Sequence, residues 1–358
     1  MTIEKKIKGT AFLLTNGAFM EVDGKTSHGL IRGSTRFTIT AVIDHKHFGQ
    51  DAGMLLDGKN RGIPIFATIE EAMKIAGKPD YCIIGMATVG GKLPQSFEKK
   101  IQEALSHSIS VINGLHDFLN EKPEFVKLAE LNNAQLIDIR KPRSFRELRF
   151  WTSEIYSVQC PIIALLGMDC AVGKRTTGQF ILEACKRAGK KAEMIYTGQT
   201  GWLQGYKYGF IFDATLNDFV SGELSHAVLD AYRNEDPDFI FLEGQSSLRN
   251  PSGPCGAELL LSGNAKYVIL VHEIGRKHYD ENPEWGLIPT VESEIKLIEA
   301  YHSKVIALVL NTRESSKEEV KSARIKYERQ LDIPVLLPVE EGVDMILPVL
   351  EKLKQNEN

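Results

Sequence analysis

Long runs of lysine or arginine are missing from this sequence, whose formal net charge is -4 and whose pI is near 6.2. A polyanion partner is therefore not indicated, and we expect no binding to nucleic acid. Apolar runs of the ~20 residues that cross a bilayer are also missing, and the N-terminal residues MTIEKK lack the apolar core of a signal peptide. We expect a soluble, cytoplasmic protein without a membrane partner.

Cysteine is scarce and has no metal-binding or redox spacing. The five cysteines form no CxxC pair, and their odd number in a chain of 358 residues argues against a disulfide framework. We therefore expect reduced thiols. The cysteines are Cys82, Cys160, Cys170, Cys185 and Cys255.

Short apolar runs alternate with segments of helical periodicity along the whole chain. This alternation predicts an α/β protein with a Rossmann-like N-terminal domain over residues 1–150, followed by a P-loop NTPase-like parallel α/β domain over residues 155–358. A chain of this length, 43% hydrophobic, suits two such domains. We expect strands at residues 11–14, 37–43, 63–66, 81–84, 109–113, 161–166, 192–196, 239–242, 267–271, 305–310 and 335–337.

Four segments of the N-terminal half have two interpretations each. Residues 25–32 contain groups suited to anion binding, or form an exposed loop. Glycine-bearing loops at residues 85–92 and 114–116 follow strands, where an open sheet places its ligand, but a structural or dimerising domain is equally consistent, so a homo-oligomer is possible. His45 and His47 have an i, i+2 spacing, but without a third ligand nearby a solvated loop is favoured over a metal site.

The stretch GMDCAVGKRTT organises the C-terminal half. It follows a buried strand and opens a helix, which is the context that a phosphate-binding loop requires. Backbone amides and the helix N-terminus attract a phosphate chain there, and Lys174 is expected to be solvent-facing and to reach its oxygens. The predicted phosphate-binding residues are Gly167, Asp169, Cys170, Ala171, Val172, Gly173, Lys174, Arg175, Thr176 and Thr177.

This loop departs from the pattern GxxxxGK[ST] in two ways. Five residues separate Gly167 from Gly173, one more than the pattern allows. Arg175 stands where the hydroxyl that holds magnesium is expected, which displaces the hydroxyl to Thr176 or Thr177. Phosphate binding is therefore better supported than magnesium-assisted phosphoryl transfer. Thr176 and Asp213 are the candidate metal ligands.

Polar residues at three strand ends are expected to converge on the loop. Glu243 ends a buried strand, where P-loop proteins place an acidic residue that orients metal or water. The alternative for Glu243 is a helix-capping role. Cys170 has two interpretations, a nucleophilic thiol whose pKa the helix N-terminus lowers or a small residue packed in a tight loop, and the second is favoured. The other expected site residues of these strand ends are Thr197, Gln199, Thr200, Gln245, Ser246 and His272.

Four segments in this order resemble the DUF1611 family, which is linked to D-glutamate N-acetyltransferase: GMDCAVGKRTT, IYTGQTGWLQG, DATLNDFVSGELSHAV and FIFLEGQSSL. The loop and the EGQ strand end also resemble dethiobiotin synthetase, a P-loop ligase. Segments of the N-terminal half are loosely similar to the CoA-binding domain of acyl-CoA synthetases. The DUF1611 resemblance implies acetyl transfer from acetyl-CoA to the amine of an acidic D-amino acid.

Under this implication each candidate residue has a role. Lys174, Glu243 and His272 are the catalytic candidates, with Glu243 or His272 as the base. Hydrogen-bond donors for the thioester oxyanion would come from Thr197, Gln199 or Ser246, and a cation for the substrate carboxylate from Arg175, Arg249 or Arg32. The alternative is an ATP- and Mg²⁺-dependent ligase or kinase that activates a carboxylate.

Overall fold

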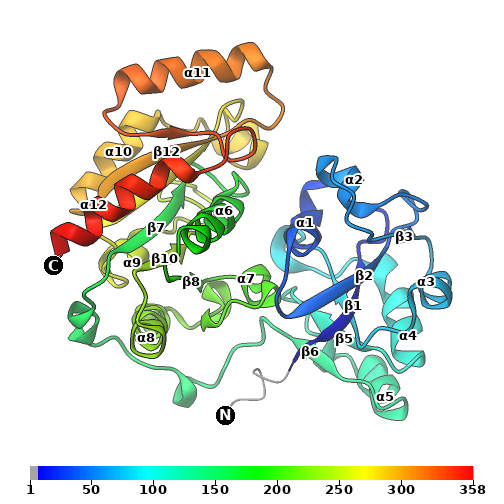
Figure 1. Cartoon of the computed structure of the whole chain (residues 1–358). Coiled ribbons are helices and arrows are strands. Elements are labelled where there is room, and N and C mark those ends of the chain that lie inside the picture. The colour runs from blue at the N-terminus through cyan, green and yellow to red at the C-terminus, as the bar shows by residue number, and fades with distance from the viewer. Residues whose placement is uncertain (1–6, 358) are drawn as a thin grey trace. The chain divides into compact units, whose positions relative to one another are not determined.

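The computed structural model describes residues 7–357, and its contacts divide the chain into two compact units. Unit 1 contains the chain up to Pro142 together with Gln199–Tyr206. Unit 2 contains Arg143–Gly198 and the chain from Lys207 onward. Each unit has its own parallel sheet and apolar core, as Figure 1 shows by the blue-to-cyan and the green-to-red strands.

Within the described residues, unit 1 has a six-stranded parallel sheet of order β3-β2-β1-β4-β5-β6. The order reverses between β1 and β4, as it does in Rossmann-like folds. Strands β1 and β4 are buried along most of their length because their residues are almost all apolar. The strands are β1 Gly9–Leu14, β2 Phe37–Ile43, β3 Ile65–Phe66, β4 Tyr81–Ile84, β5 Ser110–Asn113 and β6 Leu136–Asp138.

Helices follow most of these strands, and two of them begin at clear capping residues. The side chain of Asp51 accepts hydrogen bonds from two amides of α2, and that of Thr68 accepts one from α3. Residues 25–32 form α1 and not a loop, and Thr26 and Ser27 are buried in its first turn. The helices are α1 Lys25–Arg32, α2 Ala52–Asp57, α3 Ile69–Ala76, α4 Glu98–Ser106 and α5 Pro123–Leu131.

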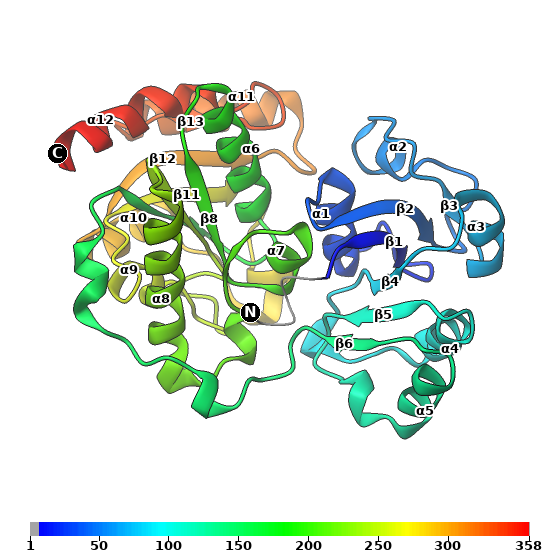
Figure 2. The same ribbon diagram turned by 60° about the horizontal axis from the view of Figure 1, so that its bottom comes forward.

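The helix α7, Gln199–Gln204, follows a strand of unit 2 in the sequence but packs within unit 1 beside α1, as Figure 2 shows. Gln204 Nε2 donates to the Gly29 carbonyl oxygen at 2.9 Å. The guanidinium of Arg36 donates to the Trp202 carbonyl oxygen at 2.8 Å and stacks over the Trp202 ring. All six residues of α7 are buried.

Within the described residues, unit 2 has a seven-stranded parallel sheet of order β13-β12-β11-β7-β10-β8-β9. Its central strands are continuous Val, Ile and Leu runs because helices cover both faces. The strands are β7 Ile162–Gly167, β8 Ala192–Tyr196, β9 Tyr208–Gly209, β10 Phe239–Glu243, β11 Tyr267–Glu273, β12 Lys304–Asn311 and β13 Val335–Leu336.

The helices of unit 2 obey the same local rules. Ser316 and Glu319 form a capping box at the start of α11, and Pro348 lies in the first turn of α12, where proline is tolerated. The helices are α6 Lys174–Arg187, α8 Asn217–Glu235, α9 Ala257–Leu261, α10 Val291–Ala300, α11 Lys317–Gln330 and α12 Leu347–Glu357. Over residues 7–357, none of the helices has the length and apolar character needed to span a membrane.

Candidate phosphate-binding site

The loop between β7 and α6 adopts a tightly turned backbone. Gly173 (φ 105°) and Ala171 (φ 54°) lie in the left-handed region, which glycine adopts at little cost and alanine seldom does. A Cβ atom on Gly167 would lie 2.7 Å from the Val172 side chain, so this position also requires glycine. The sequence therefore produces the strand, loop and helix order that was predicted from GMDCAVGKRTT.

The amides of this loop are available to a ligand. In the described part of the chain, no amide from Cys170 to Gly173 donates to a protein acceptor. A residue of β12 holds the loop instead: Asn311 Nδ2 donates to the Val172 carbonyl oxygen at 3.0 Å. A run of unpaired amides at the start of a 14-residue helix is a ready site for an anion.

Lys174 is buried, with 7% of its surface exposed, so the expectation that it faces solvent is wrong. Its Nζ donates to the carbonyl oxygens of Asp169, at 2.7 Å, and Ser246, at 2.6 Å. These contacts hold the ammonium group within the loop. Charge and position still suit a phosphate ligand, but the side chain also supports the loop itself.

Asp169 supports the loop and does not offer its carboxylate to phosphate. The carboxylate is fully buried and accepts hydrogen bonds from Asn250 Nδ2 at 2.8 Å, Arg276 Nη1 at 2.9 Å and the Asp280 amide at 2.7 Å. Arg276 also donates to Glu273 Oε2 at 2.9 Å, which links the loop to the end of β11. An anionic carboxylate would in any case repel phosphate.

Glu243 lies at the end of β10 and is buried beside Arg175. Glu243 Oε1 is 3.7 Å from Arg175 Nε, and Glu243 Oε2 accepts the Thr197 amide at 3.1 Å. Burial raises the pKa of the Glu243 carboxyl, although the Arg175 charge opposes the shift. The Thr197 hydroxyl donates to the Glu243 carbonyl oxygen at 2.8 Å and accepts from Gln245 Nε2 at 2.9 Å.

Cys170 is a residue of the loop and lies beside Ser246, which follows β10. Its Sγ is 3.4 Å from the Ser246 hydroxyl oxygen. Burial raises the pKa of the Cys170 thiol, which opposes formation of a nucleophilic thiolate. Ligand atoms of Asp169, Cys170 and Asp280 all lie within 4.8 Å of one another in the described chain. The hydrogen bonds that Asp169 already accepts leave this group poorly suited to a metal ion.

The comparisons with known families cover both units. A model described as "Domain of unknown function (DUF1611_C) P-loop domain" matches residues 149–347. A model described as "Domain of unknown function (DUF1611_N) Rossmann-like domain" matches residues 45–142. The chain belongs to the DUF1611 family. The predicted resemblance and the predicted fold class are confirmed.

Three relatives of this DUF1611 protein are similar over most of their length. A D-glutamate N-acetyltransferase of Pseudoalteromonas sp is 28% identical, covering 78% of this chain and 83% of the relative. One of Tritonibacter scottomollicae is 28% identical, covering 82% and 86%. The crystal structure of a DUF1611 protein from Anabaena variabilis is 27% identical with a TM-score of 0.87, covering 98% of this chain and all of that one.

Several predicted site residues of this family member have contacts away from the loop. Gln199 and Thr200 belong to α7 in unit 1, where Thr200 contacts Thr26. Arg249 is paired with the buried carboxylate of Glu294 in α10, at 2.7 Å from Nε. The structure thus directs the Arg249 charge to a protein carboxylate.

The two candidate metal ligands lie on different elements. Thr176 is in the first turn of α6, whereas Asp213 is exposed in the short helix Phe212–Ala214. Asp213 does not belong to the His, Cys, Asp and Glu group that comes close enough to hold a metal in the described chain.

His272 packs against a helix on one face of the sheet. Its ring forms an edge contact with Tyr327 of α11, with ring centroids 6.0 Å apart. Glu273, the next residue on β11, points to the opposite face, where it meets Arg276. Burial first, and then the Lys326 charge, lower the pKa of His272 to about 4, opposed by Glu292.

We expect His272 to weaken the protein at acidic pH. The unfolded chain takes up a proton near pH 6.5, whereas the folded chain does so only near pH 4, so stability falls as the pH drops through this window. At about 1.4 kcal/mol per pKa unit, the loss reaches about 3 kcal/mol. His272→Phe should flatten this part of the pH profile in urea unfolding, while His302→Asn at an exposed position should not.

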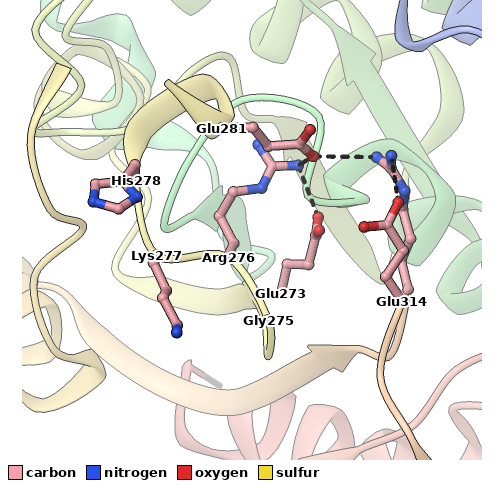
Figure 3. Close-up of a pocket in the computed structure, with 8 residues that line it drawn as sticks. Glu273, Gly275, Arg276, Lys277, His278, Glu281 and Glu314 are labelled. Atoms are coloured by element: carbon pink, nitrogen blue, oxygen red, sulfur yellow. Dashed lines mark hydrogen bonds and ion pairs between the residues drawn. The ribbon is translucent and has the colours of Figure 1, made fainter. Parts of the chain in front are cut away.

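A hollow of about 350 Å³ lies beside the network of Asp169, Arg276 and Glu273, and most of its lining residues were not indicated by the sequence (Figure 3). The guanidinium of Arg276 meets Glu273 and, at 3.1 Å, Glu281, and Arg313 also lies near Glu281. Because Arg276 and Arg313 lie 2.9 and 3.0 Å from a carboxylate oxygen, closer than the 3.7 Å between Arg175 and Glu243, we assign phosphate to the loop and not to the hollow. The hollow is lined by Glu273, Gly275, Arg276, Lys277, His278, Glu281, Arg313 and Glu314.

Proposed function

We propose that this chain is an N-acetyltransferase that transfers the acetyl group of acetyl-CoA to the amine of an acidic D-amino acid such as D-glutamate. Two relatives of that name, each covered over more than four fifths of its length, support the reaction class. The unpaired amides of Cys170 to Gly173 carry the proposal for the cofactor. They would hold the pyrophosphate of acetyl-CoA.

The surroundings of the loop support binding of a pyrophosphate. Lys174 and Arg175 place two cations at the start of α6, and the positive end of this helix adds a partial charge. The nearby carboxylates of Glu243 and Asp169 each lie beside a guanidinium, of Arg175 and of Arg276, so neither is an unbalanced negative charge. CoA contains the same pyrophosphate linkage that P-loops bind in nucleotides.

The polar residues at the ends of β8 and β10 supply groups for acyl transfer. The substrate ammonium must first lose a proton, and a carboxyl whose pKa is raised, as in Glu243, is the candidate acceptor. The amine nitrogen then forms a bond to the thioester carbon, the C–S bond breaks, and the CoA thiolate takes up a proton. Thr197, Gln245 and Ser246 are the candidates for positioning the reacting groups.

The competing function is an ATP- and Mg²⁺-dependent ligase that activates a carboxylate. Glu243 favours it to some extent, because P-loop ligases and kinases use a strand-end carboxylate near the metal. The two functions need different co-substrates, so product analysis separates them.

Incubation of the purified protein with acetyl-CoA and D-glutamate tests the proposal. Mass spectrometry should detect N-acetylglutamate and CoA in equal amounts, which avoids interference from the five protein cysteines in a thiol assay. L-Glutamate is the stereochemical control. If no acetylated product forms, but ATP is consumed with Mg²⁺ and an acidic substrate, the ligase function replaces the proposed one.

Glu243→Gln should reduce kcat by about 100-fold or more, because general-base catalysis typically contributes that much. Glutamine retains an oxygen to accept the Thr197 amide and removes a negative charge beside Arg175, so CoA affinity should not fall. Steady-state kinetics and calorimetry with CoA provide the two measurements. Unchanged kcat would remove Glu243 from the base role while leaving the binding site in place.

A further inference from the structure

We infer that Arg175 takes the place of magnesium, so that the loop recognises a pyrophosphate without a metal ion and is selective for metal-free CoA over Mg²⁺-bound nucleotides. The inference rests on the proposed role of the loop in phosphate binding. It adds that the positive charge at the phosphates is the guanidinium of Arg175 and not a metal ion.

The first observation is the pairing of Arg175 with Glu243. In a P-loop with magnesium, the residue after the lysine contributes a hydroxyl ligand and a strand-end carboxylate faces the metal. Here Arg175 replaces the residue with the hydroxyl, and Glu243 is the strand-end carboxylate. Arg175 Nε lies 3.7 Å from Glu243 Oε1. The positive charge that Glu243 requires as a buried anion is therefore supplied by the protein.

The second observation is the chemistry of the available ligands. Magnesium takes oxygen ligands at about 2.0–2.1 Å in an octahedron, and a guanidinium has no lone pair to offer. A magnesium ion facing Glu243 would also lie beside the Arg175 charge, and the two cations would repel. Arginine is well suited to the alternative task, because its planar group donates two parallel hydrogen bonds to phosphate oxygens.

The neighbouring hydroxyls do not replace the missing one. Successive residues of a helix are turned by about 100° around its axis, so the directions of Thr176 and Thr177 differ from that of Arg175 by about 100° and about 200°. Thr177 is buried, with 3% of its surface exposed. The residues present at this site therefore do not fit a magnesium ion.

Calorimetry with CoA and with ADP, each in Mg²⁺ and in EDTA, tests the inference. The wild-type affinity for CoA should change less than about twofold between the two conditions. Arg175→Val should bind CoA and ADP about tenfold to hundredfold more weakly than wild type, in Mg²⁺ and in EDTA, because it removes a charge-assisted contact. Arg175→Thr has the same shape as the valine variant but restores the hydroxyl, so it should regain ADP affinity in Mg²⁺ alone.

Thermal unfolding of both variants shows whether they are folded, and the wild-type comparison does not depend on them. A tenfold or greater rise of wild-type affinity on adding Mg²⁺ would overturn this inference alone and leave the loop as a binding site. Equal behaviour of the threonine and valine variants in Mg²⁺ would also contradict it. Absence of any CoA or ADP binding by the wild type would instead remove the proposed function, and this inference with it.

Discussion

Lys174→Met should reduce the affinity for CoA by at least about tenfold, since charge-assisted hydrogen bonds contribute about 1.5–3 kcal/mol each. Methionine retains much of the aliphatic volume but cannot donate to the carbonyl oxygens of Asp169 and Ser246. We also expect the free energy of unfolding to fall by about 1–3 kcal/mol, because these two carbonyl oxygens lose their hydrogen-bond donor.

Calorimetry with CoA and urea unfolding measure the two effects separately. Lys186→Met is the matched control, because Lys186 is exposed in the last turn of the same helix. It should affect neither quantity. Wild-type affinity in the Lys174 variant would exclude residues 167–177 from the cofactor site.

Arg276→Met should lower the free energy of unfolding by about 3–5 kcal/mol, which is the usual effect of removing one partner from a buried ion pair. The side chain is 4% exposed and donates to Asp169 and Glu273, which are both buried. Without the guanidinium, these carboxylates lose their compensating charge. Urea unfolding at pH 7 is the measurement.

Arg313→Met provides the comparison for this prediction. Arg313 lies in the same hollow and pairs with Glu281 and Glu314, but its side chain is 41% exposed. Exposed pairs contribute about 0–1 kcal/mol, so this variant should be close to wild type. Equal losses in the two variants would contradict a special role for the buried network.

Adding Asp169→Asn to Arg276→Met should recover part of the stability, because the double variant no longer buries an unpaired charge at position 169.

The sequence predicts the loop well because its signals are local. A buried strand, two glycines and a helical apolar pattern lie within about two dozen residues, and each restricts the backbone by itself. The convergence of Glu243, Thr197, Gln245 and Ser246 also follows from topology, since the ends of parallel strands meet at one edge of a sheet.

The residues that support the loop have no local signal. Asn250, Arg276 and Asp280 reach Asp169 across more than 80 residues of sequence, and only the folded chain brings them together. A basic cluster directly after β11, Arg276 to His278, was the one visible hint. Arg249 and His272 were predicted as site residues because they lie near strand ends. That position did not reveal their partners, Glu294 in α10 and Tyr327 in α11.

Short or polar elements were also missed. Strands β6 and β9 have three and two residues, too few to show a hydrophobic period. Helix α1 contains Gly29 and few apolar residues, so its pattern resembled a loop. Gly29 is needed because a Cβ there would lie 2.8 Å from the Thr200 side chain of α7, a contact that depends on the whole of unit 1.

The membership of α7 in unit 1 affects how the chain folds during synthesis. Domains generally fold from the N-terminus as they leave the ribosome. Unit 1 cannot finish folding when synthesis reaches Pro142, because Trp202 and Leu203, which are buried in it, are synthesised later. The nascent chain must first deliver β7, α6 and β8. The face of α1 that receives α7 therefore remains uncovered until the phosphate-binding loop has already been made.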